Sequence, residues 1–488
     1  MTKALEHLEP KIVWRYFEDI TQIPRPSKHE EQIREWLINF AKQHSITYQV
    51  DAVGNVRLEK PASPGMESLP MVCLQSHMDM VAERAPNAPV DPETEPLQLV
   101  VDEDKVTANQ TTLGADNGIG IALSLALMTD PEVRHGPLEA LITVDEETGL
   151  TGAFGLEAGF LKSDILLNID SEDWGVVTIG CAGGGDTLVT FPATWTLQTD
   201  GVPLELSVGG LKGGHSGVDI HTHRQNAIHV LSRAVEALTN LDPTLRLGAV
   251  MGGSKRNAIP RDAHCLLLLQ SKHLEKARAV LEELNKTLAK ELPPEASVKL
   301  NLTEKEGSLA VIDPSDTKRF VDFLRVTPHG IYRWSPVVSN LVETSNNLGV
   351  IRTTESGYEL VFNTRSSVNS QLDDHRARIE ALARLGGCEV VQENAYPGWQ
   401  PDPDAPLLEF VSNQYEKILG KKPVVEAIHA GLETALLGRH NPKMQMISLG
   451  PTIKNPHSPD EYVEIRTVDL MYELLKMILL ELPADLVK

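Results

Sequence analysis

The sequence has few cysteines, few aromatic residues and no long apolar segment. Its four cysteines include no CxxC pair, so neither a disulfide framework nor a cysteine-ligated zinc site is expected. No apolar run approaches the roughly 20 residues of a membrane-spanning helix. The N-terminal segment MTKALEHLEPK lacks the apolar core of a signal peptide. We therefore expect a globular cytoplasmic protein with reduced core thiols at Cys73, Cys181, Cys265 and Cys388.

Basic residues are also scarce relative to acidic ones. The chain has 45 Lys and Arg against 68 Asp and Glu, which gives a formal net charge of -23. Such a chain repels nucleic acid and anionic membranes, so we expect neither as a partner. The 41% hydrophobic and 23% charged content is typical of folded proteins. A length of 488 residues exceeds what one core usually supports and favours two domains.

The first 190 residues alternate between apolar strands and helical patterns. MVCLQSH, LEALITV and DILLNID predict short strands buried on both faces, and NGIGIALSLALMTD predicts a buried helix. Residues 46–60 predict a β-hairpin, and Ser27 with Glu30 predicts a capping box before a second helix. This alternation indicates the α/β class, with a mostly parallel core sheet.

The pattern changes near residue 190. LVTFPATW, LELSVGG and HCLLLLQ predict longer strands, and a long helical pattern follows the last of them. The order RDAHCLLLLQ, helix, SVKLNL returns as ESGYELVFNTR, helix, CEVVQEN, which indicates an internal duplication. After the proline-rich stretch YPGWQPDPDAP the α/β pattern resumes. We therefore predict an α/β domain of residues 1–190 and 400–488, interrupted by an α+β insert of residues 191–399.

Acids and histidines follow the predicted strands of the α/β domain, where open sheets bind their ligands. Each has an ordinary explanation on its own, such as a helix N-cap, a turn or a solvated acidic loop. Together, two histidines and several carboxylates suit a borderline divalent metal. The residues concerned are His77, Asp79, Asp116, Asp145, Glu146, Glu147, Asp170 and His457.

The spacing of these residues indicates that neighbouring side chains have different roles in the site. Residues 77 and 79 point the same way in an extended segment, so Asp79 can accept a proton from the His77 nitrogen that is not on a metal. Of the adjacent Glu146 and Glu147, one can bind metal while the other acts as a base toward water. Asp116 is placed centrally enough to bridge two ions.

Five motifs in this order, SHMDMV, GADNGIG, DEETG, NIDSED and HSPDE, resemble those of the dizinc aminoacylase/carboxypeptidase/carnosinase metallopeptidase family. The resemblance covers the whole chain and implies that the insert is a lid. It further implies two zinc ions, with cobalt or manganese as possible substitutes, bridged by Asp116. Glu146 is implied as the general base, and Asp79 as the residue that orients His77. The implied metal ligands are His77 and Asp170 for one ion, Glu147 and His457 for the other, and Asp116 for both.

The insert and the segment after it carry four further motifs: GGLKGGHSG, GGSKRNAIP, VFNTRSS and HAGLET. The resemblance implies that His215 polarises the scissile carbonyl and that Asn257, Arg365 and the Gly431 backbone contact substrate. Taken alone, His215 reads as a loop residue, Asn257 as a turn residue and Arg365 as a surface charge.

The resemblance implies a cytosolic dipeptidase that prefers Xaa-His substrates such as carnosine, with Arg365 gripping the free carboxylate. An N-acyl amino acid deacylase of the same family is the alternative, since it uses the same metals and the same grip. A phosphoesterase would favour basic metal loops, whereas these are acidic. A non-catalytic binder would not need Glu146. We expect a homodimer, with a duplicated insert that lets His215 act within its own chain.

Overall fold

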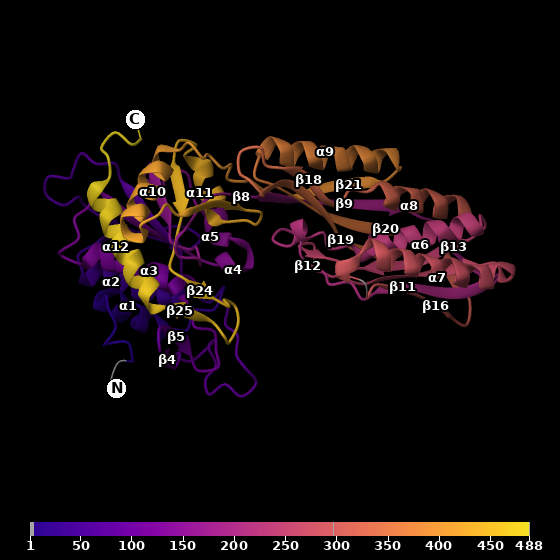
Figure 1. The fold of residues 1–488 in the computed structure, drawn as a ribbon, viewed down its shortest axis with the longest axis horizontal. Coiled ribbons are helices and arrows are strands. Elements are labelled where there is room, and N and C mark those ends of the chain that lie inside the picture. Colours follow the sequence, from indigo (N-terminus) through magenta and orange to yellow (C-terminus); the bar gives the residue numbers. More distant parts are fainter. Residues whose placement is uncertain (1–3, 296, 488) are drawn as a thin grey trace. The chain divides into compact units, whose positions relative to one another are not determined.

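A computed structural model describes residues 4–295 and 297–487. The chain forms two compact units, each with its own apolar core (Figure 1). The first unit comprises Met1–Gly180, Pro401–Ala427 and Leu432–Lys488, and the second comprises Cys181–Gln400 and Ile428–Gly431. The predicted boundary at residue 190 falls inside strand β9 (Gly183–Pro192), which pairs with strands of the second unit.

The first unit is built on an eight-stranded sheet in the order β1-β2-β6-β3-β7-β23-β8-β22. Its four central strands run parallel, whereas β2 and β8 pair antiparallel with their inner neighbours. The α/β class with a mostly parallel core is thus confirmed. The strands are β1 (Thr47–Val50), β2 (Val56–Lys60), β6 (Leu138–Thr143), β3 (Val72–His77), β7 (Ile165–Asn168), β23 (Gln445–Ser448), β8 (Val176–Cys181) and β22 (Val424–Ile428).

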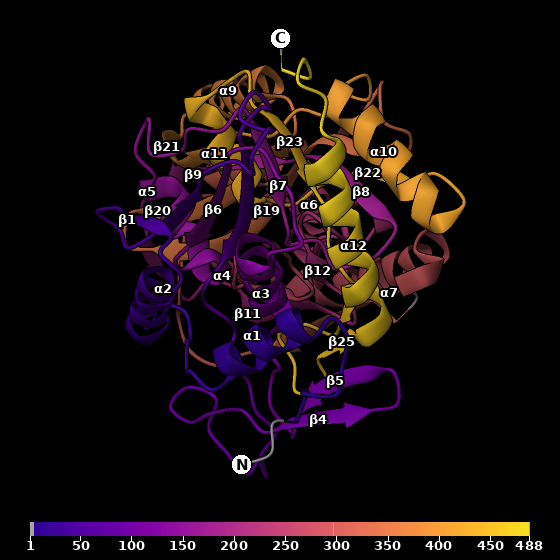
Figure 2. The ribbon, with the colours of Figure 1, turned by 90° about the vertical axis from the view of Figure 1, so that its left-hand side faces the viewer.

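Helix α3 (Ala115–Thr129) is the central helix of this unit. It is apolar on nearly all sides and packs against β3 and β6, with α1 and α12 beside it (Figure 2). A small sheet, β24-β25-β5-β4, lies elsewhere in the unit. The remaining elements are α1 (Lys11–Thr21), α2 (Glu31–Gln43), α4 (Glu146–Gly149), α5 (Thr151–Gly155), α10 (Pro406–Leu419), α11 (Glu433–Leu437), α12 (Ile465–Glu481), β4 (Leu99–Asp102), β5 (Lys105–Ala108), β24 (Ile453–Lys454) and β25 (Tyr462–Glu464).

The predicted capping box at the start of α2 is wrong. Glu30 is the N-cap residue and makes no side-chain cap bond. Its carboxylate instead accepts hydrogen bonds from the backbone N–H groups of Lys28 and Asp145. Ser27 Oγ donates to Asp79 Oδ2 at 2.8 Å. The neighbouring Lys28 and the distant Asp145 and Asp79 therefore replace the reciprocal bonds that the Ser-x-x-Glu spacing predicts.

The second unit is built on a nine-stranded antiparallel sheet. Its main path is β16-β11-β15-β13-β19-β20-β9-β21, and β18 pairs with β19 beside that path. Helices α6 to α9 pack against these strands, and α6 also contacts α7 and α8. The helices and strands not yet given are β10 (Thr196–Gln198), β11 (Val202–Gly209), β12 (Gly214–His215), α6 (Ala227–Leu241), β13 (Arg246–Gly252), β14 (Ala258–Ile259), β15 (Ala263–Leu269), α7 (Leu274–Glu291), β16 (Lys299–Glu304), β17 (Leu309–Val311), α8 (Pro314–Val326), β18 (Gly330–Trp334), β19 (Val342–Thr354), β20 (Gly357–Ser366), α9 (Asn369–Leu385) and β21 (Glu389–Tyr396).

This sheet consists of two halves with the same topology. One half runs β11-α6-β13-β15-α7-β16 and has the sheet order β16-β11-β15-β13. The other runs β9-α8-β19-β20-α9-β21 and has the order β21-β9-β20-β19. The halves join where β13 pairs antiparallel with β19. The predicted duplication is therefore confirmed, and the first half is inserted after the first strand of the second.

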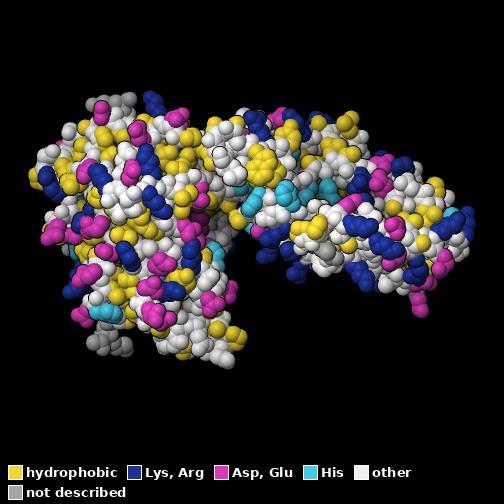
Figure 3. All heavy atoms as spheres, viewed as in Figure 1, with side chains coloured by type: hydrophobic (Ala, Val, Ile, Leu, Met, Phe, Trp, Pro, Cys, Tyr) yellow, Lys and Arg dark blue, Asp and Glu magenta, His cyan; other side chains and the backbone are white. Residues whose placement is uncertain are grey.

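Charged side chains of both signs are interspersed on the visible face of the first unit (Figure 3). Within the described residues, no helix combines the length and apolarity needed to cross a bilayer.

Candidate active site

His77 lies at the end of the buried strand β3 and is itself 1% exposed. Its Nδ1 lies 3.3 Å from Asp79 Oδ1, while Nε2 lies 2.9 Å from Asp116 Oδ1 and 3.3 Å from Asp170 Oδ1. Asp79 also accepts from the backbone N–H groups of Glu146 and Glu147. The Asp79 carboxylate is thereby fixed, and one ring nitrogen of His77 is directed at two further carboxylates.

Asp116 stands at the centre of the group. It lies in the first turn of α3, where its backbone departs from helical geometry. One carboxylate oxygen faces His77 Nε2, and the other lies 3.2 Å from His457 Nε2. His457 Nε2 also lies 3.0 Å from Glu147 Oε2. Asp116 thus joins a His77–Asp170 pair to a Glu147–His457 pair.

These residues form two sets that fit metal ions. Ligand atoms of His77, Asp116 and Asp170 lie within 4.8 Å of one another, as do those of Asp116, Glu147 and His457. Glu147 Oε1 is buried, and within residues 4–295 and 297–487 it has no hydrogen-bond partner. Buried carboxylates at this spacing repel one another unless cations lie between them. Imidazole and carboxylate donors of this kind suit zinc and similar divalent ions.

Glu146 belongs to neither of these two sets, but it lies beside one residue of each. It can place a carboxylate oxygen within 4.8 Å of ligand atoms of His77 and Glu147. Burial raises the pKa of Glu146 well above its ordinary value, with Asp170 and Glu433 adding to the effect. A bound cation would oppose that shift, because it favours the carboxylate form. A carboxylate so placed suits proton transfer.

Several residues that support this group were missed by the sequence analysis. The Glu461 carboxylate accepts hydrogen bonds from the four consecutive backbone N–H groups of residues 113–116 and so holds the loop that carries Asp116. Arg25 is fully buried and donates to the backbone carbonyls of Met78, Asp79 and Gly114. Glu461 belongs to the motif HSPDE, whereas nothing in the local sequence marks Arg25.

Glu433 is a further buried acid, beneath the end of β3. Its Oε2 accepts from Gln75 Nε2 at 2.6 Å and from Thr143 Oγ1 at 2.7 Å. Burial raises the pKa of Glu433 to about 8. The carboxyl group therefore ties α11 to the two strands that carry His77 and the Glu146 loop.

The remaining predicted residues lie in the second unit. His215 ends β12, which pairs with β14, so Asn257 lies on the adjacent strand connection. His215 Nδ1 accepts from the backbone N–H groups of Gly217 and Val218 at 3.2 and 3.0 Å. Burial and the nearby Arg365 lower the pKa of His215. Because Nδ1 accepts these two bonds, a neutral His215 ring carries its proton on Nε2.

Arg365 lies close to this histidine within the second unit. A Cβ added to Gly217 would lie 3.1 Å from His215 Cε1 and 3.3 Å from Arg365 Nε. Arg365 is 6% exposed, and its Nε has no hydrogen-bond partner among the described residues. Gly431 packs against the ring of Tyr396. Asn257 is exposed, and its carbonyl accepts from Ser216 N.

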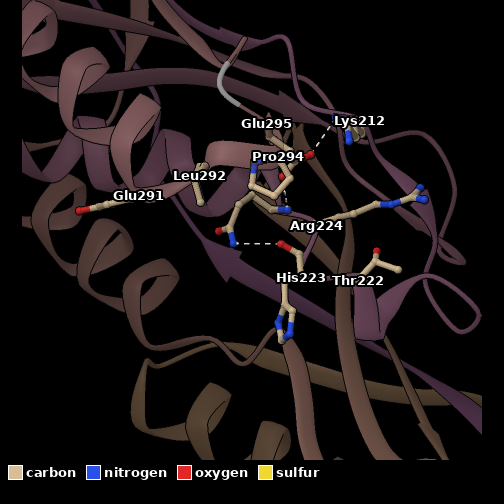
Figure 4. A pocket seen from close by; sticks show the side chains of 9 residues that line it. Lys212, Thr222, His223, Arg224, Glu291, Leu292, Pro294 and Glu295 are labelled. Atoms are coloured by element: carbon tan, nitrogen blue, oxygen red, sulfur yellow. Dashed lines mark hydrogen bonds between the residues drawn. The ribbon is translucent and has the colours of Figure 1, made fainter. Parts of the chain in front are cut away.

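Glu295 anchors the segment that carries His215. It is 4% exposed and accepts from Lys212 N at 2.8 Å and from Gln225 N at 2.7 Å (Figure 4). The two bonds hold both ends of residues 212–225. A hollow of about 240 Å³ lies beside Glu295, with His223 and Arg224 in its wall.

Comparison with known proteins decides the family. Residues 73–481 match peptidase family M20/M25/M40. The chain belongs to this family. It is 39% identical over 487 residues to the cytosol non-specific dipeptidase of Escherichia coli K12, covering 98% of this chain and 99% of that protein.

Solved structures of family relatives agree. The aminoacylhistidine dipeptidase of Vibrio alginolyticus superimposes with a TM-score of 0.91 and 42% identity, with 98% of each chain covered. An aminopeptidase from Bacillus cereus, at 16% identity and a TM-score of 0.56 over 99% of this chain and 100% of its own, shares the fold. The resemblance predicted from the five motifs is thus confirmed, and the chain is a metallopeptidase.

Proposed function

We propose that this protein is a cytosolic dipeptidase that hydrolyses Xaa-His and related dipeptides with two zinc ions. The observation that carries the proposal is the sharing of Asp116 between two ligand sets, with Glu146 beside them. The names of the Escherichia coli and Vibrio alginolyticus relatives support the substrate class and the location. Cobalt and manganese are candidate substitutes for zinc, because they accept the same donors.

The residues of the first unit divide the chemistry among them. His77, Asp116, Glu147, Asp170 and His457 would hold the ions, which supply a Lewis acid and lower the pKa of a water molecule. Glu146 accepts the proton of the attacking water and returns it to the leaving amine. Asp79 holds the His77 ring through Nδ1 and receives two backbone N–H groups from the Glu146–Glu147 turn.

The residues of the second unit bind the substrate. His215 donates a hydrogen bond from Nε2 to the carbonyl oxygen of the substrate, which stabilises the negative charge that develops there. Arg365 pairs with the free carboxylate of the dipeptide, which charge-assisted bonds to a guanidinium suit well. Asn257 and the Gly431 backbone complete the contacts. Because the second unit is a duplicated lid, we propose that His215 acts within its own chain and that the protein forms a homodimer.

A substrate panel tests this function against the alternative, an N-acyl amino acid deacylase. Turnover of Ala-His and carnosine is compared with turnover of acetyl-His, in zinc-loaded protein and after chelation. We expect metal-dependent hydrolysis of the dipeptides and little of acetyl-His. Preferential hydrolysis of acetyl-His would assign the deacylase activity instead.

A further inference from the structure

The two halves of the second unit differ at one edge strand. In the first half, β16 pairs with β11 in continuous register from Leu204↔Glu304 to Gly209↔Lys299. In the second half, the corresponding strand β21 slips against β9 between Glu393↔Asp186 and Tyr396↔Gly184. Three steps along β21 thus match two along β9, which defines a β-bulge. Bulges of this kind re-aim a side chain and often lie beside functional sites.

The bulge is held in place by polar groups, of which Arg376 and Asp186 are buried. Arg376 donates to the carbonyls of Asp186 and Glu393 at 3.0 and 3.1 Å. Asn394, which has a positive φ of 51°, donates to Asp186 Oδ2 at 2.9 Å. Asp186 is 1% exposed. A cluster this well bonded indicates a fixed conformation.

The bulge brings Tyr396 into line with Arg365. Gly184 pairs with Arg365 on β20 and with Tyr396 on β21, so the three residues form one row across the sheet. In continuous register, Ala395 would take the place of Tyr396. Arg365 Nη1 donates to the Tyr396 hydroxyl across this row at 3.4 Å.

Glycines make room for this contact. A Cβ on Gly184 would lie 2.8 Å from the Tyr396 hydroxyl oxygen, and one on Gly431 would lie 3.2 Å from the ring. A Cβ on Gly183 would lie 2.5 Å from the Tyr396 carbonyl oxygen. The glycines of the sequence CAGGGD thus leave the space that Tyr396 occupies.

We propose that Tyr396 is a positioning residue that orients the Arg365 guanidinium toward the carboxylate of the substrate. This inference rests on the proposed function, because it requires a ligand with a free carboxylate. The hydroxyl accepts a hydrogen bond from Nη1, and the bulge fixes the hydroxyl in the row. The buried Nε of Arg365 has no hydrogen-bond partner in the part of the chain that the structure describes. Tyr396 therefore sets the preference for a free C-terminus over a neutral one.

Binding measured without turnover tests the proposal. Calorimetry on zinc-loaded Glu146→Ala protein compares Ala-His with Ala-His amide, before and after Tyr396→Phe is added. Loss of one charge-assisted hydrogen bond predicts about tenfold weaker binding of Ala-His. The amide should change by less than about twofold, because it lacks the charge that Arg365 binds. In an Arg365→Ala background, Tyr396→Phe should add nothing.

Tyr358→Phe is the matched control, because Tyr358 is a buried tyrosine of the same unit that donates to Gly248 O. This substitution should leave the ratio of the Ala-His and Ala-His amide affinities unchanged. Gly184→Ala, which presses on Tyr396, should reproduce the Tyr396→Phe pattern. Equal weakening of acid and amide, additivity with Arg365→Ala, or no acid preference in the parent protein would overturn the inference. Failure of wild-type protein to hydrolyse any dipeptide would instead overturn the proposed function.

Discussion

The two units hold their candidate residues in opposite electrical surroundings. In the first unit, Asp116, Glu147 and Asp170 crowd together with two imidazoles at strand ends. In the second, a buried guanidinium at Arg365 adjoins His215, whose pKa is lowered by burial and by that arginine. The first group needs cations to offset its charge, whereas the second needs an anion. This contrast underlies the proposal that the first unit supplies the metal chemistry and that Arg365 in the second binds a substrate carboxylate.

The adjacent glutamates test the metal half of this contrast, where the largest effects are expected. Glu147→Ala should lose metal and nearly all activity, since Glu147 belongs to a ligand set. Glu146→Ala should keep its metal while kcat falls by about 10²–10⁴, the range for a general base. Metal analysis beside steady-state kinetics provides the check. Equal metal loss in both variants would show that the two roles are wrongly divided.

His215 tests whether the second unit contributes to the chemical step. His215→Ala should lower kcat by about 10²–10³, as loss of one oxyanion donor does, without loss of metal. Inactive His215→Ala and Glu146→Ala proteins are then mixed under conditions that allow subunit exchange. The mixture should stay inactive, because no chain carries both residues. Recovery of activity would place His215 in the partner's site.

The proposed pairing of Arg365 with the substrate carboxylate is tested by combining Arg365→Ala with amidation of the substrate. Arg365→Ala should lower kcat/KM for dipeptides by about 10- to 100-fold, the cost of hydrogen bonds to a charged group. Amidation of the substrate should lower kcat/KM by a similar factor in the wild type, and it should change kcat/KM of the variant little. Losses that simply add would show that the guanidinium and the carboxylate do not meet.

Glu461 should affect metal affinity and leave the substrate preference unchanged. Glu461→Gln leaves an amide in place of the carboxylate that receives the N–H groups of residues 113–116. Loss of such an outer support predicts about 10- to 100-fold weaker metal affinity with a normal substrate preference. A competition titration with a chelator measures the affinity. A changed preference for Ala-His over its amide would contradict the assignment of metal binding and substrate recognition to different residues.

Features that a local sequence pattern encodes were predicted correctly more often than features that depend on contacts between distant residues. Apolar strands with polar residues at their ends predicted the parallel core and placed His77 and Asp170 together, because β3 and β7 are parallel neighbours. Asp116 lies instead in the first turn of α3, and the strand before it, β5, belongs to the small antiparallel sheet. The repeated topology of the second unit could be predicted because each half repeats strand, helix and strand. The roles assigned to the individual site residues remain predictions.

Long-range contacts were beyond reach of the sequence. The Ser-x-x-Glu spacing predicted a cap, but Ser27 bonds Asp79, 52 residues away. Arg25 supports the site from an unpatterned loop. The β21 bulge depends on Arg376 and Asp186, which are distant in sequence, and no periodicity marks it. Glu461 alone had a signal, its place within the HSPDE motif.

Reconstitution of metal-free protein tests the central claim most directly. Stripped protein is titrated with zinc while bound metal and Ala-His hydrolysis are followed together. The two ligand sets joined by Asp116 predict no activity in the stripped protein, binding of two ions per chain, and activity that rises with occupancy. Full hydrolysis of Ala-His by protein shown to be free of metal would contradict the account.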